Sequence, residues 1–382
     1  MTGPVVDRTV LLTLGRLPKA LEVARALHAA GCRVVVAEPF RRHLTGASRQ
    51  VARSVQVTSP VIDREAYLGE LTALAVAEGV SLILPVSEEI LHVSLLHGRM
   101  PAGVRLAAMP HPTLLALHDK LSFTEVCRAA GVAAPETFDL DDPQALQLAA
   151  AVPTVVKPVF SCSGRGVRFL SPGDALPRYD ERAVVQRRCD GRLLSTFTLA
   201  RAGEPRITVT YRGAVMQGTV AVCFERIDTP PAVQAWVSTM VRHTGFDGFI
   251  SFDLIEDAAG GISGIECNPR ATSGVHFVDP AGLAQALLDP SSDAPLAFKP
   301  DRFMQQFYPC LTETQRTMFG HGPFRQNLRC LIAARDVTWS SRDPWPLVSQ
   351  PWTSWPIIEQ ALRRRCTFGE VAMLDLAWGA GA

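Results

Sequence analysis

The chain has 382 residues, with 38 Lys and Arg against 37 Asp and Glu, and a formal net charge of +1. This length suits two or three packed domains, and the near-neutral charge argues against nucleic acid or an acidic membrane surface as a partner. Residues 1–10 contain no apolar signal core, and no apolar run reaches the length of a membrane span. The nine cysteines include no C-x-x-C pair, which disfavours a zinc site or a disulfide framework. We therefore expect a cytoplasmic globular protein.

The first hundred residues alternate strand and helix patterns. In chain order they predict a strand at 9–14, a helix at 19–30, a strand at 33–37, a helix at 67–78 and a strand at 80–84. Such alternation predicts a parallel sheet with helices on its faces. Ligands of parallel sheets bind at the carboxyl ends of the strands, where Gly15, Arg16 and the segment 87–89 are expected.

A dinucleotide-binding domain is the main alternative for this region. Its first turn needs the spacing G-x-G-x-x-G, whereas the turn here has the single glycine Gly15 between Leu14 and Leu17. Those two leucines would obstruct the close approach of a pyrophosphate to the backbone. The sequence therefore disfavours NAD or FAD at this position.

A lysine and a loop of small residues mark the middle of the chain. Lysine is rare, and its four positions are Lys19, Lys120, Lys157 and Lys299. A predicted strand at 154–158 carries Lys157, and the loop at 161–166 follows before strands at 167–170 and 183–186. Glycines in such a loop allow backbone N–H groups to approach polyphosphate oxygens, although no Walker A motif is present. A hairpin turn with an incidental lysine is the alternative interpretation.

A second group of polar residues lies between positions 249 and 270. Residues 249–255 and 262–268 predict two strands of a hairpin that bring Asp253 and Glu266 onto adjacent strands. Glu266 and Asn268 are two residues apart and therefore face the same side. Two carboxylates and an amide oxygen are ligands that suit Mg²⁺, and Arg270 is placed to meet an anion beside the metal. An edge hairpin with polar residues facing water is the alternative interpretation.

The remaining segments carry weaker signals. Residues 193–256 are rich in predicted strands, with a helix near 233–244, and the patterning weakens after Pro280. Residues 300–382 hold five of the six tryptophans and predict no function by themselves.

Together these groups resemble the motifs of ATP-grasp enzymes. The order and spacing of the following elements carry the resemblance: Lys120, Lys157, the loop 163–166, Gln186, Asp253 and the E-x-N-P-R segment from Glu266 to Arg270. The resemblance implies a fold of the α/β and α+β classes. It also implies four segments: a pre-ATP-grasp α/β domain at 1–115, a small lobe with the glycine loop at 116–190, a large lobe with the metal site at 191–295, and a C-terminal extension at 296–382.

The resemblance also implies which residues contact ATP. Lys120 and Lys157 would contact the α-phosphate, with Lys157 also near the adenine. Backbone groups from Ser163 through Gly164 to Gly166 would cover the β- and γ-phosphates. The adenine would be bound by Gln186, the backbone at Arg187 and the side chain of Ile255.

The resemblance further implies the metal and catalytic residues. Asp253, Glu266 and Asn268 would bind one or two Mg²⁺ ions, with Mn²⁺ as an alternative. Arg270 would stabilise the transferring phosphoryl group, together with Lys157. A lower-ranked set that could line the substrate pocket consists of Ser273, Gly274, His276 and Glu88.

Two positions depart from the common family pattern. Many members carry Gly-x-Glu-Tyr-Ser after the hinge between the lobes, and the Glu binds the ribose. This chain has Leu193 at that position, so Asp190 or a neighbour would have to replace it. The first metal carboxylate is Asp253, where many relatives use the longer Glu.

The function implied by the resemblance is an ATP-dependent carboxylate–amine ligase that forms an acyl phosphate and releases ADP. Its partners would be a small carboxylate and an amine, without nucleic acid or membrane, and a homodimer is one option for its assembly. Two alternatives stay open. One is an enzyme that activates bicarbonate, although no biotin-carrier segment is present. The other is an ATP-binding sensor or scaffold without turnover. The identity of both substrates is left open by the sequence.

Overall fold

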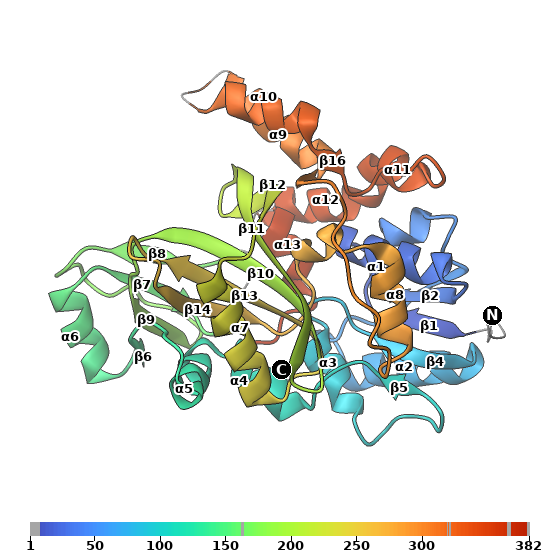
Figure 1. Ribbon diagram of the computed structural model, residues 1–382, viewed down its shortest axis with the longest axis horizontal. Helices are drawn as coiled ribbons and strands as arrows, with labels where there is room; N and C mark the ends of the chain where they lie inside the picture. Colours follow the sequence, from blue (N-terminus) through green and yellow to red (C-terminus); the bar gives the residue numbers. More distant parts are fainter. Residues whose placement is uncertain (1–7, 162–163, 319, 321, 365–367, 380–382) are drawn as a thin grey trace.

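The computed structural model describes residues 8–161, 164–318, 320, 322–364 and 368–379 (Figure 1). Three β-sheets succeed one another along the chain, and a group of helices follows them. The N-terminal sheet and the large central sheet lie on opposite sides of the molecule in Figure 1, with C-terminal helices reaching across both.

The N-terminal sheet contains five parallel strands in the order β3-β2-β1-β4-β5. Its strands are β1 (Thr9–Leu12), β2 (Arg33–Glu38), β3 (Arg53–Gln56), β4 (Val80–Leu84) and β5 (Arg105–Leu106). The helices of this region are α1 (Pro18–Ala29), α2 (Arg64–Ala77), α3 (Ile90–Val93) and α4 (His111–His118). Strands β1, β2 and β4 are almost wholly apolar and buried because helices cover the sheet. The parallel α/β sheet expected from the sequence is confirmed.

A small antiparallel sheet follows, with the strand order β6-β9-β7-β8. Its elements are α5 (Lys120–Ala130), β6 (Thr137–Asp139), α6 (Pro143–Ala151), β7 (Thr154–Pro158), β8 (Arg168–Leu170) and β9 (Ala183–Arg187). Asp119 caps α5 by accepting hydrogen bonds from the N–H groups of Leu121 and Ser122. The helix ends where Gly131 adopts a left-handed φ of 73°. This cap fixes the direction in which Lys120 leaves the first turn.

The large sheet has seven strands in the order β14-β13-β10-β11-β12-β15-β16. Its elements are β10 (Arg192–Arg201), β11 (Glu204–Gln217), β12 (Val220–Ile227), α7 (Pro231–Thr244), β13 (Gly248–Glu256), β14 (Ile262–Asn268), β15 (Phe303–Gln305) and β16 (Arg335–Asp336). Strand β14 is last in this order, but its outer edge is covered by the preceding region. The N–H of Gly264 donates to Ala133 O at 3.0 Å, and Lys157 Nζ donates to Ile265 O at 3.0 Å. The hairpin is therefore not open to water along that edge.

The C-terminal region is mostly helical. Its helices are α8 (Pro280–Leu288), α9 (Phe307–Met318), α10 (Phe324–Ala333), α11 (Trp345–Thr353), α12 (Trp355–Arg364) and α13 (Phe368–Leu374). Helix α8 packs on α1, and the buried ion pair of Arg25 with Asp343 holds the segment before α11 against the N-terminal region. In Figure 1 the orange and red helices extend from above the central sheet to the N-terminal sheet.

One hydrophobic core connects the N-terminal and central sheets. It runs from Val10 and Val34 in the parallel sheet to Phe197 and Phe277 beside the large sheet. This shared core fixes the carboxyl ends of β1 and β4 relative to the β13–β14 hairpin. None of the helices in the described residues combines the length and apolar composition needed to cross a membrane.

Candidate active site

Two carboxylates face each other on the β13–β14 hairpin. Asp253 and Glu266 are register partners on the antiparallel strands, and Asn268 follows Glu266 on the same side. Ser195 Oγ, from the neighbouring strand β10, donates to Asp253 Oδ1 at 2.6 Å. Burial, and next the charge of Glu266, raise the pKa of Asp253 to about 6. Two negative charges held this close favour a bound cation.

Two lysines, one at the start of α5 and one on β7, lie near the same carboxylates. Lys120 Nζ lies 3.8 Å from Glu266 Oε2 and donates to the carbonyl oxygen of Ser161 at 2.8 Å. Lys157, on β7, donates to Gln186 Oε1 and to Ile265 O, each at 3.0 Å. Burial lowers the pKa of Lys157 to about 8, although the charge of Glu266 acts in the opposite direction. Both lysines are almost fully buried.

Arg270 links the hairpin to the N-terminal region. Its Nη2 donates to Asn268 Oδ1 at 2.8 Å, and its Nε donates to Glu88 Oε1 at 2.8 Å. Burial alone would raise the pKa of Glu88, but Arg270 and then His118 lower it to about 2. The Nε2 of His118 lies 3.4 Å from Glu88 Oε2, and burial lowers the pKa of this histidine. Glu88 therefore keeps its negative charge and fixes the orientation of the Arg270 guanidinium.

These residues fit a Mg²⁺ ion that shares its ligands with a nucleotide. Among the described residues no group of three His, Cys, Asp or Glu side chains could hold a metal by itself. Asp253 and Glu266 supply two hard oxygens, and Asn268 Oδ1 supplies a third. Mg²⁺ typically combines one or two carboxylates with substrate phosphates rather than binding in an all-protein site. The donor set is adequate for such a shared site.

The glycine loop is described only in part. Ser163 lies outside the described residues, whereas Gly164 and Gly166 adopt φ values of 72° and 70°. A Cβ atom at Gly164 would lie 2.5 Å from Thr219 Oγ1 in the turn between β11 and β12. Glycine is needed at this position both for the backbone angle and for the contact with Thr219.

The residues expected around the adenine lie at the junction of the two lobes. The buried Gln186 side chain accepts from Lys157 and donates to Thr137 Oγ1 at 3.0 Å, so it also positions that lysine. The N–H of Arg187 donates to Glu136 O at 2.8 Å. Ile255 pairs with Leu193 across β13 and β10. Leu193 is half exposed, and the carboxylate of Asp190 is almost fully exposed beside Arg188.

The four residues ranked lower for a substrate pocket lie in two different environments. Glu88 contacts Arg270, as described. Gly274 packs against Phe197, and a Cβ atom there would lie 2.4 Å from the Phe197 Cβ. His276 is buried, with Nδ1 3.1 Å from Glu22 Oε2 on α1. Ser273 begins the same 3₁₀ turn, Ser273–Phe277. This turn packs into the core, where Gly274 and His276 are buried.

Sequence reasoning did not select Ser195 or His118 as site residues. Ser195 is the last residue of the segment in which Leu193 replaces the expected Glu. That segment was the one sequence feature that could have pointed to Ser195 as a site residue. His118 precedes Asp119 and Lys120, and its contact with Glu88 joins positions 30 residues apart. No local pattern reveals such a contact.

Comparisons with known proteins support the fold of the chain. Residues 117–274 match the ATP-grasp domain family, and no curated protein sequence matches the chain. The fold is similar to that of N5-carboxyaminoimidazole synthetase from Staphylococcus aureus, with 14% identity, a TM-score of 0.63, and coverage of 85% of this chain and 89% of that one. It is also similar to L-amino acid ligase from Bacillus licheniformis, with 15% identity, a TM-score of 0.56, and 74% coverage of each chain.

A larger enzyme shares the same fold over part of its length. Pyruvate carboxylase from Rhizobium etli has 18% identity and a TM-score of 0.61, and the match covers 76% of this chain but 29% of that chain. Proteins at this level of identity share the fold, and their activities differ. Residues 117–274 therefore form an ATP-grasp domain, and the chain as a whole shares the fold of the enzymes named above.

Proposed function

We propose that this protein is an ATP-dependent carboxylate–amine ligase that works through an acyl phosphate. The observation that carries the proposal is the convergence of two lysines, two carboxylates, an amide and an arginine between the lobes. We call this set the polar cluster, and its members are Lys120, Lys157, Asp253, Glu266, Asn268 and Arg270.

The first step is the transfer of the γ-phosphoryl group of ATP to the substrate carboxylate. A carboxylate oxygen attacks the γ-phosphorus, the bond to the bridging oxygen breaks, and ADP leaves. Lys120 and Lys157 would balance the phosphate charge, while Arg270 would orient the accepting carboxylate and stabilise the transferring group. A Mg²⁺ ion held by Asp253, Glu266 and Asn268 would supply further charge neutralisation at the phosphates.

The second step is amide formation. The amine nitrogen attacks the acyl carbon, the bond to the phosphate oxygen breaks, and inorganic phosphate leaves. The attacking nitrogen must also lose a proton. His118 is suited to accept it, because burial lowers the pKa of this residue and Glu88 stands 3.4 Å away to stabilise the protonated ring.

The activation of bicarbonate is the second candidate. Pyruvate carboxylase and N5-carboxyaminoimidazole synthetase share the fold, and bicarbonate is itself a small carboxylate that Arg270 could orient. A hydroxylamine trap separates the two candidates, because this strong nucleophile converts an acyl phosphate into a hydroxamate without knowledge of the natural amine. A ligase gives ADP and a hydroxamate with an organic acid. A bicarbonate-activating enzyme releases ADP when bicarbonate is added alone.

The nucleotide site can be tested without any substrate. We expect Mg-ATP binding by calorimetry in the wild type, and a roughly 10- to 100-fold loss of affinity in Lys157→Ala because a buried charge-assisted contact is removed. Lys299→Ala is the matched control, since Lys299 pairs with Glu22 outside the polar cluster. The absence of Mg-ATP binding by the folded wild type would refute the ligase and the bicarbonate candidates together.

A further inference from the structure

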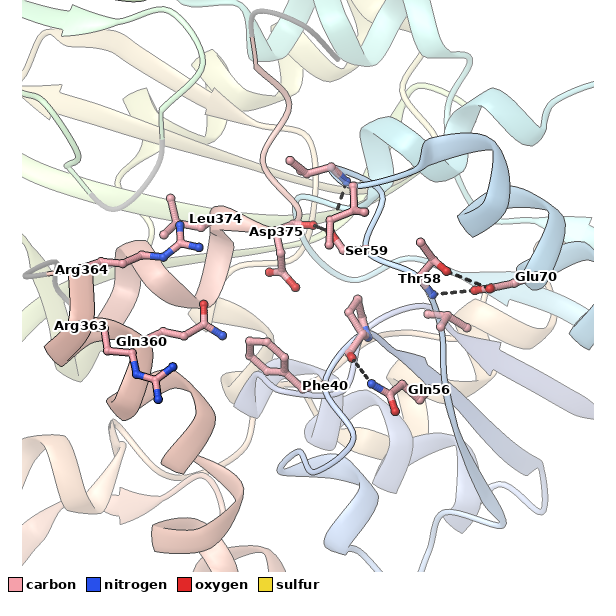
Figure 2. A pocket seen from close by; sticks show the side chains of 14 residues that line it. Phe40, Gln56, Thr58, Ser59, Glu70, Gln360, Arg363, Arg364, Leu374 and Asp375 are labelled. Atoms are coloured by element: carbon pink, nitrogen blue, oxygen red, sulfur yellow. Dashed lines mark hydrogen bonds between the residues drawn. The ribbon is translucent and has the colours of Figure 1, made fainter.

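A large cavity lies away from the polar cluster, over the N-terminal sheet. Its volume is about 1040 Å³, and none of the polar cluster residues lines it. One wall comes from the residues that follow β2 and β3, including Phe40 and Thr58, and the opposite wall comes from α12 and the end of α13 (Figure 2). The carboxyl ends of parallel strands are the usual ligand positions in such sheets. The C-terminal extension thus adds a second wall beside the strand edge, and the resulting pocket stays open to solvent.

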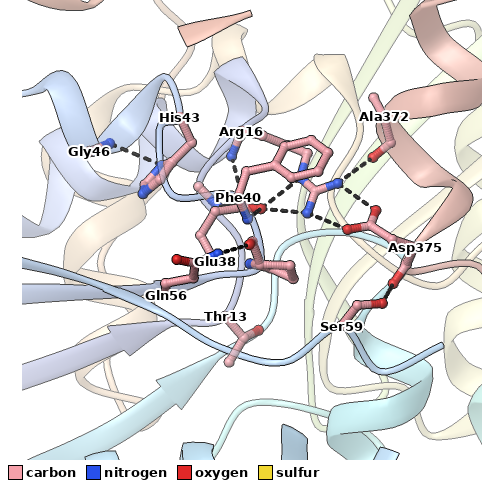
Figure 3. A network of polar contacts seen from close by, with 12 residues as sticks. Thr13, Arg16, Glu38, Phe40, His43, Gly46, Gln56, Ser59, Ala372 and Asp375 are labelled. Carbon is pink, nitrogen blue, oxygen red and sulfur yellow. Dashed lines mark hydrogen bonds and ion pairs between the residues drawn. The ribbon is translucent and has the colours of Figure 1, made fainter. Parts of the chain in front are cut away.

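A buried ion network fixes the wall that the two regions share. The Arg16 guanidinium pairs with Glu38 from β2 and with Asp375 after α13, and the Phe40 ring covers it at 3.8 Å (Figure 3). Ser59 Oγ donates to the carbonyl oxygen of Asp375 at 2.8 Å. Contacts from both sides therefore hold Phe40 and Asp375 in place before a ligand arrives.

The charged side chains that line the cavity are separated by sign, although Arg363 also pairs with Glu359 beside it on α12. Arg363 and Arg364 extend from α12 on one side, and Glu70 stands on the other side with Asp375 between them (Figure 2). The Glu70 carboxylate is oriented by the N–H and the hydroxyl of Thr58, at 2.6 Å and 2.9 Å. A ligand that satisfies both sides must carry a negative and a positive group at separate positions.

Apolar side chains occupy the space between these charges. Val61, Ile62 and Leu374 line the cavity together with the Phe40 ring. Ile62 is 82% exposed and Val61 is 51% exposed, values that are high for large apolar residues beside a cavity. A bound apolar group would remove their surface from water. The volume is at the upper end of the range for small-molecule sites, which suits an organic molecule and not a single ion.

We propose that this cavity binds a small zwitterion with an apolar side chain, namely an amino acid or a short peptide. The carboxylate would meet Arg363 and Arg364, the ammonium would meet Glu70, and the side chain would lie against Phe40 and its apolar neighbours. This site goes beyond the proposed ligase function and does not depend on it, because binding here requires neither ATP nor the polar cluster.

The test uses the full-length protein without ATP. Calorimetric titrations with L-phenylalanine and with the dipeptide L-phenylalanyl-L-alanine distinguish the two sources of the zwitterion. Two analogues each lack one charge: 3-phenylpropionate has no ammonium, and phenethylamine has no carboxylate. We expect at least one zwitterion to bind, and each analogue to bind roughly tenfold more weakly or not at all, because each analogue can form only one of the two ion pairs. The proposal is overturned if neither zwitterion binds or if an analogue binds equally well.

Variants locate the binding in the cavity. The double substitution Arg363→Ala with Arg364→Ala should weaken zwitterion binding at least tenfold, and Glu70→Gln should weaken it to a smaller extent. The matched control is Arg325→Ala with Arg329→Ala, which removes two arginines from α10 outside the cavity. Unchanged zwitterion affinity in the α12 variant would also overturn the proposal. Mg-ATP affinity should stay unchanged in all of these variants, so failure here is distinguishable from failure of the nucleotide site.

Discussion

In the β13–β14 hairpin, Asp253 and Glu266 stand opposite each other, and Lys120 Nζ lies 3.8 Å from Glu266 Oε2. At the C-terminal extension, Asp375 instead meets Arg16 at 2.5 Å, and that guanidinium also pairs with Glu38. The pKa of Asp253 is raised to about 6 by burial and by Glu266. The hairpin therefore concentrates charge of one sign, whereas the contact with the extension pairs opposite charges.

This difference separates two uses of buried charge. Like charges held close together lower the unfolding free energy because they repel each other. Such an arrangement suits a binding site in which the ligand brings the neutralising cation. Opposite charges that pair with each other suit a structural contact, because removing either partner leaves an uncompensated buried charge and lowers the stability of the fold. We call the contact of Arg16 with Glu38 and Asp375 the joint. Substitutions in the hairpin should therefore change activity more than stability, and substitutions at the joint should do the reverse.

Arg16→Met should give the largest effect of the predictions drawn from this comparison. The substitution leaves Glu38 fully buried without its main partner, which should cost about 3 to 5 kcal/mol of unfolding free energy. Urea unfolding followed by far-UV circular dichroism measures the loss. The double variant Arg16→Met with Glu38→Gln removes the stranded charge and should recover much of the stability. Equal losses in both variants would contradict a charge-based joint.

Glu266→Gln should have the opposite outcome. It keeps the shape of the side chain and removes one of the two facing charges, so the unfolding free energy should change little or rise. ADP formation should fall by roughly 10²- to 10³-fold, since groups that stabilise transition-state charge contribute effects of this size. Rates of ADP release at saturating Mg²⁺ provide the measurement. A catalytic rate within a factor of a few of the wild type would contradict a role for Glu266 at the transition state, whereas the absence of ADP formation by the wild type would argue for the sensor alternative.

The hairpin could be predicted from the sequence because the features that define it lie within about twenty consecutive residues. The alternation of strand residues places Glu266 and Asn268 on one face, and a turn of five residues brings Asp253 opposite Glu266. The first sheet was predictable for the same reason, since strands β1, β2 and β4 are short apolar runs between helices with clear ends. The fold class and the family were confirmed on these features.

The joint could not be predicted because its contacts are distant in sequence. Arg16 and Asp375 are 359 residues apart, and Arg270 and Glu88 are 182 residues apart. His276 follows Arg270 closely in the chain and was proposed to line the substrate pocket, and its Nδ1 lies 3.1 Å from Glu22 Oε2 on α1. Closeness in sequence therefore does not predict which neighbours a side chain contacts once the backbone has turned.

Glu22 is another buried carboxylate with a structural role, and its contribution to the unfolding free energy should depend on pH. Burial would raise its pKa, but Lys299 and then His276 lower it to about 2, against an ordinary value of 4.5. A carboxyl whose pKa is lower in the folded state stabilises the fold above its unfolded pKa, and this stabilisation is lost as the pH falls toward the folded value. About 2 kcal/mol should disappear between pH 6 and pH 3.

Unfolding free energies of the wild type and Glu22→Gln across that range check this expectation. The wild type should lose more stability than the variant as the pH falls, and the difference between them should shrink toward pH 3. Parallel curves for the two proteins would show that the Glu22 carboxyl is not held in its charged form by Lys299 and His276.

Asp375→Asn should produce the smallest effect, because this residue forms the outer part of the joint. Its side chain is 23% exposed, and Arg16 keeps Glu38 when Asp375 loses its charge, so we expect a loss of about 1 kcal/mol. Five of the six tryptophans lie after residue 300, so intrinsic fluorescence reports mainly on the extension. The fluorescence transition should move to lower urea, while Mg-ATP affinity stays unchanged.

Glu359→Gln is the control for this last substitution. It removes an exposed ion pair with Arg363 within α12, and such pairs contribute only a few tenths of a kcal/mol. A larger fluorescence shift for Asp375→Asn than for Glu359→Gln would assign the effect to the contact with Arg16 and not to a general change in surface charge. Equal shifts would place the stability of the extension in its apolar packing. A loss of Mg-ATP affinity in Asp375→Asn would instead mean that the joint and the polar cluster are coupled, and the separation drawn between the two regions would then fail.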